Sequence, residues 1–229
     1  MPLFLLHKGP PLWGVWKIEE SPEELLAQLT LCDLPQGVEE MRHSRRRQER
    51  LAVRVLLKEL LGRETPIAYR ANGAPYLRDN SFHISISHTR GFAAVILHRQ
   101  SPVGIDMERL NPRILRVRSR FLHPEEEAGI DVRHETEHLL LHWCAKETLF
   151  KLIGLSGVDF REHLRVLPFR YQPQGKMKAA ETRTPQGSIY MLGYMVNRYF
   201  AITWSLDMTV VKRPSLLNSA IMVLLFLIR

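Results

Sequence analysis

Two segments with the apolar spacing of a buried helix most constrain the fold, because each ends at a glycine and is followed by strand-like runs. Residues 44–62 predict one helix, and Gly62 stands where a C′ residue ends it. Residues 137–153 predict a second helix, followed in the same way by Gly154. The helical face of the first segment consists of Val53, Leu56, Leu57, Leu60 and Leu61.

Strand-like runs follow each of these helices. An Asn72-Gly73 turn signal precedes the runs at 83–88 and 91–98, and the run at 103–110 alternates apolar and polar residues with the period of a strand. The runs behind the second helix lie at 164–169, 188–196 and 199–206. This order predicts two similar α+β halves, residues 1–102 and 103–229, with a boundary near Ser101-Pro102.

The charge balance favours an acidic partner. The chain has 32 Lys and Arg against 24 Asp and Glu, which gives a net charge of +8 over 229 residues. Nucleic acid, a phosphate-rich cofactor and an acidic protein are all attracted by such a surface, and a soluble basic surface is the plain alternative. Charge therefore narrows the class of partner without choosing one.

The cysteines and the apolar ends favour a cytoplasmic protein. Cys32 and Cys144 are far apart, and the N-terminus has only four consecutive apolar residues, which is too short for a signal-peptide core. Residues 220–228 are apolar but fall well short of the ~20 residues that a transmembrane helix needs. We expect this run to be a docking strand or helix at the edge of the core, or an oligomer contact.

Asp106 and Glu108 are the first candidate ligands. They are two residues apart on a strand, so both project from one face with Cα atoms roughly 6.6 Å apart. Mg²⁺ suits such a pair, because it takes carboxylate oxygens and keeps positions for water and substrate phosphate. A solvated strand face is the alternative for an isolated pair of this kind.

The second helix carries two charges on an apolar face. Glu147 and Lys151 interrupt the stripe that contains Leu140, Trp143 and Phe150. A surface ion pair explains this poorly, because most of the helix circumference is apolar and burial of charge costs several kcal/mol without a partner. A metal for Glu147 and a phosphate for Lys151 are the partners we expect.

The first helix places one arginine on its apolar face. Arg50 lies three residues before Val53, so its guanidinium needs an inward anion, and phosphate fits its geometry. Most of the neighbouring arginines are expected to face solvent or a partner; these are Arg42, Arg45, Arg46, Arg47 and Arg54. Ser87 and His88 end a strand where both can donate to the same phosphates, although a lone histidine is more often structural.

His134 to His138 reads His-Glu-Thr-Glu-His, which matches the HExxH pattern of zinc proteases. Its flanks and middle are polar, whereas a catalytic helix of that type is buried. No glycine-histidine extension follows. We therefore take the zinc hydrolase as the weakest alternative and a chance pattern as the expected explanation.

Two ordered motifs resemble a known family. VGIDMERL at 103–110 and WCAKETLFK at 143–151 resemble the signature motifs of the 4′-phosphopantetheinyl transferases, specifically the larger two-subdomain branch of the surfactin-synthetase-activating type. The likeness extends to 50–62, 72–77, 83–89 and 121–127. It implies two subdomains related by a pseudo-twofold axis, each a small antiparallel sheet packed on a long helix, with the active site in the cleft between them.

The resemblance also implies roles for single residues. Asp106, Glu108 and Glu147 are expected to bind Mg²⁺, and Glu147 is also the expected base. Lys151 is expected to neutralise phosphate charge during catalysis. The residues expected to contact coenzyme A are Arg50, Gly73, Ser87, His88, Lys146 and Lys151.

The activity that follows is transfer of 4′-phosphopantetheine from coenzyme A to a serine of an acidic acyl or peptidyl carrier protein of fatty-acid, polyketide or nonribosomal-peptide synthesis. We expect a cytoplasmic monomer that contacts neither nucleic acid nor membrane. Ala74 departs from the family, because many relatives carry a basic residue there. A basic nucleic-acid-binding module built on residues 42–54 is the rival, but it leaves the three acids without a role.

Overall fold

The structure is a computed structural model that describes residues 2–30, 44–184, 187–206 and 211–212. Cys32, Arg42 and the apolar run at 220–228 lie outside the described residues. Within them, no helix is both long enough and apolar enough to span a bilayer.

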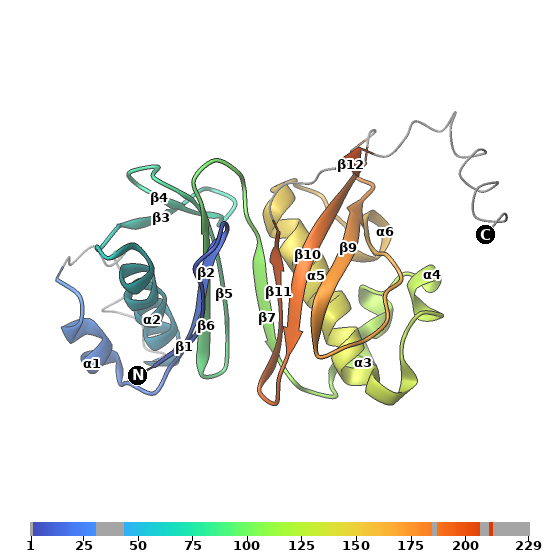
Figure 1. Ribbon diagram of the computed structural model, residues 1–229, viewed down its shortest axis with the longest axis horizontal. Coiled ribbons are helices and arrows are strands. Elements are labelled where there is room, and N and C mark those ends of the chain that lie inside the picture. The colour runs from blue at the N-terminus through green and yellow to red at the C-terminus, as the bar shows by residue number, and fades with distance from the viewer. Residues whose placement is uncertain (1, 31–43, 185–186, 207–210, 213–229) are drawn as a thin grey trace.

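Two antiparallel sheets form the centre of the molecule (Figure 1). The first has the order β1-β2-β6-β5, and the second has the order β7-β11-β10-β9-β8 with β12 paired to β10. The first sheet comprises β1 (Leu3–His7), β2 (Leu12–Lys17), β5 (His83–Thr89) and β6 (Phe92–His98). The second comprises β7 (Ile105–Arg109), β8 (Leu164–Val166), β9 (Gln174–Glu181), β10 (Ser188–Val196), β11 (Phe200–Ser205) and β12 (Val211–Lys212).

One long helix accompanies each sheet, together with shorter elements. The long helices are α2 (Ser44–Leu61) and α5 (Glu135–Ile153). The short helices are α1 (Pro22–Ala27), α3 (Ile114–Val117), η1 (Arg118–Arg120), α4 (Pro124–Glu127), η2 (Val132–His134) and α6 (Phe160–His163), and a small hairpin is formed by β3 (Ile67–Tyr69) and β4 (Pro75–Leu77).

The two halves repeat one topology. In the first half, β2 leads to α2 and then to the β5–β6 hairpin, and β2 pairs with β6. In the second half, β7 leads to α5 and later to the β10–β11 hairpin, and β7 pairs with β11. The expected α+β class, with antiparallel sheets and a long helix on each, is confirmed.

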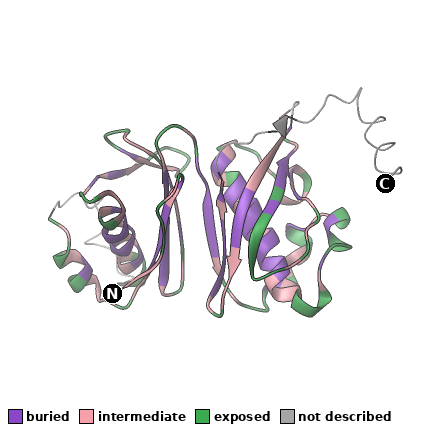
Figure 2. Ribbon diagram, viewed as in Figure 1, coloured by how far each residue is buried: buried purple, intermediate pink, exposed green. Residues whose placement is uncertain are grey.

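Buried residues form three layers of core. Figure 2 colours such residues purple along the central strands and the long helices. One core lies between α2 and the first sheet, and another lies between α5 and the second sheet. The third lies between the two sheets and takes side chains from β2, β6, β7 and β11. The order is therefore helix, sheet, sheet, helix.

Strand β6 contributes side chains to two of the three cores. Its apolar run is buried along almost its whole length. Phe92, Ala94 and Ile96 contribute to the core between the sheets, whereas Val95 and Leu97 face α2. Successive side chains on a strand point to opposite faces, so a continuous apolar run fits a strand that is covered on both sides.

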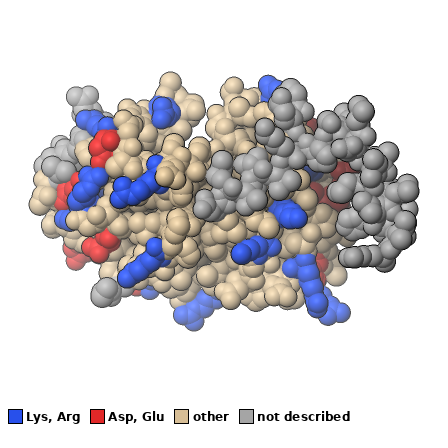
Figure 3. Space-filling model, turned by 45° about the horizontal axis from the view of Figure 1, so that its top comes forward, with Lys and Arg blue, Asp and Glu red and all other residues tan. Residues whose placement is uncertain are grey.

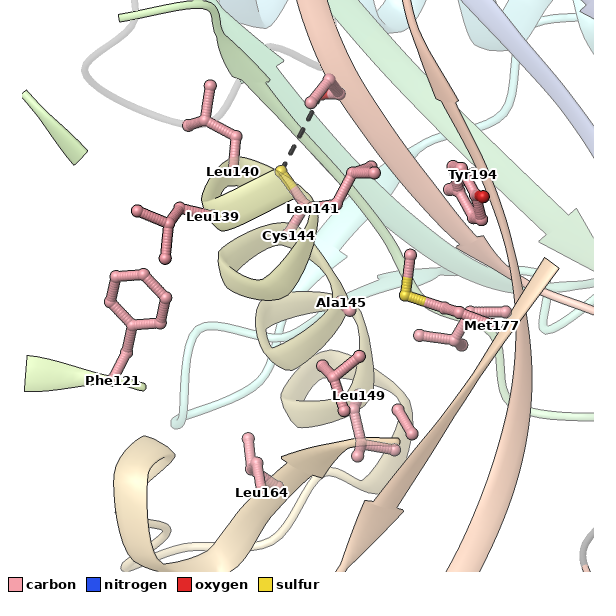
Figure 4. Close-up of a cluster of buried hydrophobic side chains, with 14 of the residues drawn as sticks. Phe121, Leu139, Leu140, Leu141, Cys144, Ala145, Leu149, Leu164, Met177 and Tyr194 are labelled. Carbon is pink, nitrogen blue, oxygen red and sulfur yellow. Dashed lines mark hydrogen bonds between the residues drawn. The ribbon is translucent and has the colours of Figure 1, made fainter. Parts of the chain in front are cut away.

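Helix α5 is the central element of the second half. Leu139, Leu141, Ala145 and Leu149 are fully buried against the surrounding core, as Figure 4 shows. Cys144 is also buried, and its thiol donates to the Ala201 carbonyl oxygen at 3.8 Å. Such burial fixes the helix, and with it the polar side chains that α5 directs toward β7.

Both long helices agree with the sequence prediction. Gly62 follows α2 with φ of +68°, and Gly154 caps α5 in the left-handed region with φ of +62°. Helix α5 begins two residues earlier than expected, at Glu135. The sequence analysis missed β1, β2 and β9, and β2 is a central strand of the first sheet.

Candidate active site

The acidic face of β7 lies against helix α5. Strand β7 alternates, so Ile105 and Met107 enter the core between the sheets while Asp106 and Glu108 project from its opposite face. Gly104 precedes the strand and approaches the helix so closely that a Cβ atom there would collide with the Thr148 carbonyl oxygen. The missing side chain lets strand and helix come into direct contact.

Asp106 is held by its neighbours at one oxygen only. The residue is 5% exposed. Its Oδ1 accepts hydrogen bonds from Ser87 Oγ at 2.9 Å and from Lys151 Nζ at 2.7 Å. Its Oδ2 is buried and has no hydrogen-bond partner among the described residues. A buried carboxylate oxygen without a donor is costly, so this atom is suited to a cation.

Glu108 and Glu147 complete a cluster of negative charge. Glu108 Oε1 accepts a bond from Trp143 Nε1 at 3.4 Å, and burial and the Asp106 charge raise the pKa of Glu108. The pKa of Glu147 rises to about 7, first because of burial and then because of Asp106 and Glu108, while Lys151 opposes the shift. Near neutral pH, the protonated and the ionised forms of Glu147 are therefore both populated.

These carboxylates have the chemistry of a magnesium site without forming a finished one. Hard cations bind carboxylate oxygens. The three carboxylates repel one another, and Asp106 Oδ2 has no hydrogen-bond donor among the described residues, so a bound cation would stabilise the cluster. However, no group of three or more His, Cys, Asp or Glu side chains arranged to hold a metal occurs in the described part of the chain. The magnesium ligands therefore remain a prediction.

A large cleft of about 1090 Å³ opens between the two halves beside this cluster. Arg50, Gly73, His88 and Lys151 all line it, so the structure brings together four predicted coenzyme contacts from different elements. Arg50 is half-buried, and its guanidinium has no carboxylate partner among the described residues. Gly73 has φ of +81°, which is the conformation its turn requires.

A second cavity of about 460 Å³ adjoins the first. Its lining includes Arg45, Arg46, Arg90, Arg109 and Glu108. Glu49 and His88 line both cavities, and they are paired to each other at 3.4 Å. Figure 3 shows that Lys and Arg side chains are spread over both halves of the visible face. Of the three acids, Glu108 lines the smaller cavity, whereas Asp106 and Glu147 line neither and adjoin the larger one through Lys151.

Lys146 does not face either cavity, and its assignment as a coenzyme contact is wrong. The side chain is completely buried. Its ammonium donates to Glu126 Oε2 and to the Phe121 carbonyl oxygen, both at 2.6 Å, and to the Phe160 carbonyl oxygen at 3.1 Å. All three of its protons are engaged, so Lys146 fastens α5 to the segments around it.

Ser87, which was also predicted to contact coenzyme A, is buried and bonds to Asp106. It is 6% exposed and lines neither cavity. Its hydroxyl donates to Asp106 and accepts a bond from the Met107 N–H at 3.1 Å. The hydroxyl proton is used within the protein.

The HExxH segment does not form one helical turn. His134 precedes α5 with φ of −128° and ψ of 38°, whereas His138 lies inside the helix and is 1% exposed. His138 contacts Phe169, and burial lowers its pKa. The two histidines therefore lack the shared helical face on which that zinc motif depends.

Several cavity residues escaped the sequence analysis. Tyr69 and Phe150 are exposed apolar side chains that line the larger cleft from opposite halves. Arg70 also lines it and lies over the Tyr76 ring at 5.1 Å. Tyr69 and Arg70 belong to a short hairpin without a periodic signal, and the apolar stripe of α5 gave Phe150 no functional role, so only the assembled cleft identifies them.

Comparison with known proteins relates part of this chain to one superfamily. Residues 102–191 match the family model of the 4′-phosphopantetheinyl transferase superfamily. This span contains β7 and α5, which supply the acidic cluster. We therefore assign this part of the chain to that superfamily, which confirms the resemblance at the level of the superfamily. The larger branch stays a prediction.

Individual relatives carry the same description. A putative 4′-phosphopantetheinyl transferase of Haemophilus influenzae is 29% identical over 181 residues, which cover 71% of this chain and 75% of the relative. A 4′-phosphopantetheinyl transferase of Bacillus subtilis is 30% identical over 86 residues, 36% of this chain and 38% of its own. The Bacillus pumilus transferase psf-1 is 31% identical over 93 residues, 39% of each chain.

Proposed function

We propose that this chain transfers 4′-phosphopantetheine from coenzyme A to a serine of an acyl or peptidyl carrier protein, in a magnesium-dependent reaction, as a cytoplasmic member of the larger two-subdomain branch. The observation that carries the proposal is the position of Glu147. It is a half-buried carboxyl group with a pKa of about 7, beside Asp106 and Glu108. Glu108 lines the smaller cavity, and Lys151, which bonds to Asp106, lines the larger one.

The reaction breaks the phosphoanhydride bond within the diphosphate of coenzyme A and forms a phosphoester bond to serine. The serine Oγ attacks the phosphorus that bears pantetheine, the bond from that phosphorus to the leaving phosphate breaks, and 3′,5′-ADP departs. The serine proton must be accepted, and Glu147 is the base assigned to it, because a group with a pKa near the working pH is the most effective general base. Positioning and charge neutralisation provide most of the catalysis in phosphoryl transfer.

The larger cleft is the proposed coenzyme site. Arg50 and His88 are placed to bind phosphate, and the open turn at Gly73 lets a ligand approach the backbone. Arg70 lines the same cleft beside Ala74, so it is our candidate for the basic contact that Ala74 does not supply. Lys151 is also assigned to phosphate, although its ammonium already donates to Asp106.

Magnesium is assigned to Asp106, Glu108 and Glu147. A bound Mg²⁺ supplies positive charge that neutralises the diphosphate of coenzyme A. The protein contributes three carboxylates, one with a free buried oxygen at Asp106 Oδ2. The two proposed subdomains, residues 1–102 and 103–229, enclose this cluster.

The smaller cavity is the proposed approach for the carrier protein. Arg46, Arg90 and Arg109 are exposed on its wall and have no carboxylate partner among the described residues. An acidic carrier is attracted to such a surface, and the attraction weakens with salt. We propose that a monomer is sufficient, because both cavities are built from one chain.

Mass spectrometry of a candidate apo-carrier, incubated with coenzyme A and Mg²⁺, tests the proposal. We expect the carrier to gain one phosphopantetheine. Glu147→Gln and Asp106→Asn each abolish the gain, whereas Glu137→Gln, which makes the same change on the same helix away from both cavities, keeps it. Full turnover in the first two variants contradicts the assigned roles, and no gain on any carrier with the wild-type protein contradicts the function.

A further inference from the structure

The two sheets meet at their edge strands through side chains. Strand β5 ends the first sheet and β7 ends the second, and the two lie beside each other (Figure 1). An edge strand leaves alternate N–H groups without a backbone partner. Burial of such a group without a hydrogen bond is costly, so the junction needs acceptors.

Hydroxyl groups at every second position of β5 supply these acceptors. Ser85 Oγ accepts from the Ile105 N–H at 3.3 Å, and Thr89 Oγ1 accepts from the Arg109 N–H at 3.2 Å. Ser87 Oγ lies between them and accepts from the Met107 N–H at 3.1 Å. The period of two places all three hydroxyls on one face of β5, which we call the hydroxyl ladder.

Ser87 differs from the other two members of the ladder. It accepts from the backbone as they do, and it also donates to Asp106 Oδ1 at 2.9 Å. Lys151 donates to the same oxygen and to the carbonyl oxygens of Ile86 and Ile105, at 3.4 and 3.1 Å, so its ammonium ties both edge strands to α5. Asp106 Oδ2 is thereby left as the oxygen without a donor.

We propose that Ser87 is a positioning residue that holds the Asp106 carboxylate by Oδ1 and leaves Oδ2 free for a cation, and that it does not contact coenzyme A. The inference rests on the proposed function, because that function assigns Asp106 to magnesium. Groups that orient a metal ligand typically change metal affinity by about 10- to 100-fold when they are removed. Because Ser87 acts through Asp106, its removal should weaken the effect of Mg²⁺ on coenzyme binding and leave coenzyme binding without Mg²⁺ unchanged.

Calorimetric binding of coenzyme A, measured in EDTA and again in Mg²⁺, separates this role from direct contact. We expect Ser87→Ala to bind coenzyme A in EDTA with an affinity within about twofold of the wild type. The factor by which Mg²⁺ increases that affinity is expected to be about tenfold smaller in the variant than in the wild type. Thr89→Ala is the matched control, because it removes a ladder hydroxyl that accepts from the Arg109 N–H and lies outside the larger cleft. It is expected to keep the magnesium response.

Conservative replacements keep the test informative if the alanine variant does not fold. Ser87→Thr retains the hydroxyl and is expected to restore the magnesium response. Ser87→Cys has a similar volume but a weaker donor, so it is expected to lose part of the response. Circular dichroism and the thermal midpoint establish that each variant is folded before binding is measured.

The outcomes are distinguishable. Weaker coenzyme binding by Ser87→Ala in EDTA overturns the inference in favour of direct contact. An unchanged magnesium response in Ser87→Ala, or the absence of any magnesium response in the wild type, also overturns it. A wild-type protein that binds no coenzyme A in either buffer refutes the proposed function itself, and the positioning role falls with it.

Discussion

The Nζ atom of Lys151 on α5 lies 2.7 Å from Oδ1 of Asp106 on β7, beside the junction of the two sheets. The Asp106 side chain is 7% exposed and that of Lys151 is 27% exposed. The pair joins α5 to β7, and the same ammonium also reaches the backbone of β5. Stability and the geometry of the acidic cluster therefore depend on the same contact.

Removal of this ammonium is expected to destabilise the protein. Lys151→Met leaves the Asp106 charge buried without its cation, so we expect the free energy of unfolding at pH 7 to fall by about 2 kcal/mol, less than for a fully buried pair because Lys151 is partly exposed. Urea denaturation measures the change. In a double-mutant cycle with Asp106→Asn, the second substitution should recover part of the loss, and strictly additive costs contradict the coupling.

The pH dependence of stability reports on Glu147. Its pKa in the folded protein, about 7, lies above the ordinary value of 4.5, so the folded state holds a proton that the unfolded state releases between those pH values. The free energy of unfolding therefore falls as pH rises through this window. In EDTA, Glu147→Gln removes the effect and should be more stable than the wild type at pH 8, by about 3 kcal/mol.

At pH 4 the advantage of Glu147→Gln is expected to vanish, because the carboxyl is then protonated in both states. Glu137→Gln serves as the control and should not alter the pH profile between 4.5 and 7. Parallel profiles for wild type and Glu147→Gln, measured by urea denaturation across this range, are incompatible with the raised pKa.

Lys146 is expected to act on stability alone. Lys146→Met leaves Glu126 buried without its cation, which costs about 3–5 kcal/mol for a fully buried pair. Addition of Glu126→Gln should recover part of the loss, because it removes the unpaired charge, while its single amide oxygen still accepts from one of the two backbone N–H groups, of His123 and Val166, that bond to Glu126. Coenzyme affinity of the folded variant, measured by calorimetry, should remain within about twofold, and a selective loss of affinity restores the original assignment.

Gly104 is expected to tolerate no side chain. A Cβ atom at this position overlaps the Thr148 carbonyl oxygen, which belongs to the rigid backbone of α5, so Gly104→Ala must separate β7 from the helix. We expect a loss of about 3 kcal/mol in thermal or urea unfolding. Gly129→Ala is the control, because its Cβ lies 3.5 Å from the Glu126 carbonyl oxygen, an ordinary contact, and should change stability by less than about 0.5 kcal/mol.

The smaller cavity predicts how carrier recognition responds to charge. Replacement of Arg90 and Arg109 together by Glu should raise the KM for an acidic carrier by about tenfold at low salt and leave the KM for coenzyme A unchanged. Arg116 and Arg133 are exposed and line neither cavity, so the same double replacement there controls for net charge. If both double variants raise the KM for the carrier equally, net charge and not the smaller cavity determines carrier binding, which contradicts the prediction.

Local patterns were sufficient for the long elements. Apolar spacing with a terminal glycine identified α2 and α5 to within two residues at their starts, because both effects act between neighbours in the chain. The alternation of β7 correctly placed Asp106 and Glu108 on one face of the strand. Strand β2 was missed, because only its pairing with β6 gives it a central place in the sheet.

The sequence by itself determined which residues carry charge on apolar faces, and Glu147, Lys151 and Arg50 were recognised for that reason. It did not determine what those charges face. Lys146 is next to Glu147 in the chain but lies about 100° away around the helix, where it is buried and donates to Glu126. Ser87 donates its hydroxyl proton to Asp106. Only the tertiary structure decided these roles, because a hydrogen bond depends on which groups the packing brings within about 3 Å, and those partners lie roughly 20 residues away in sequence.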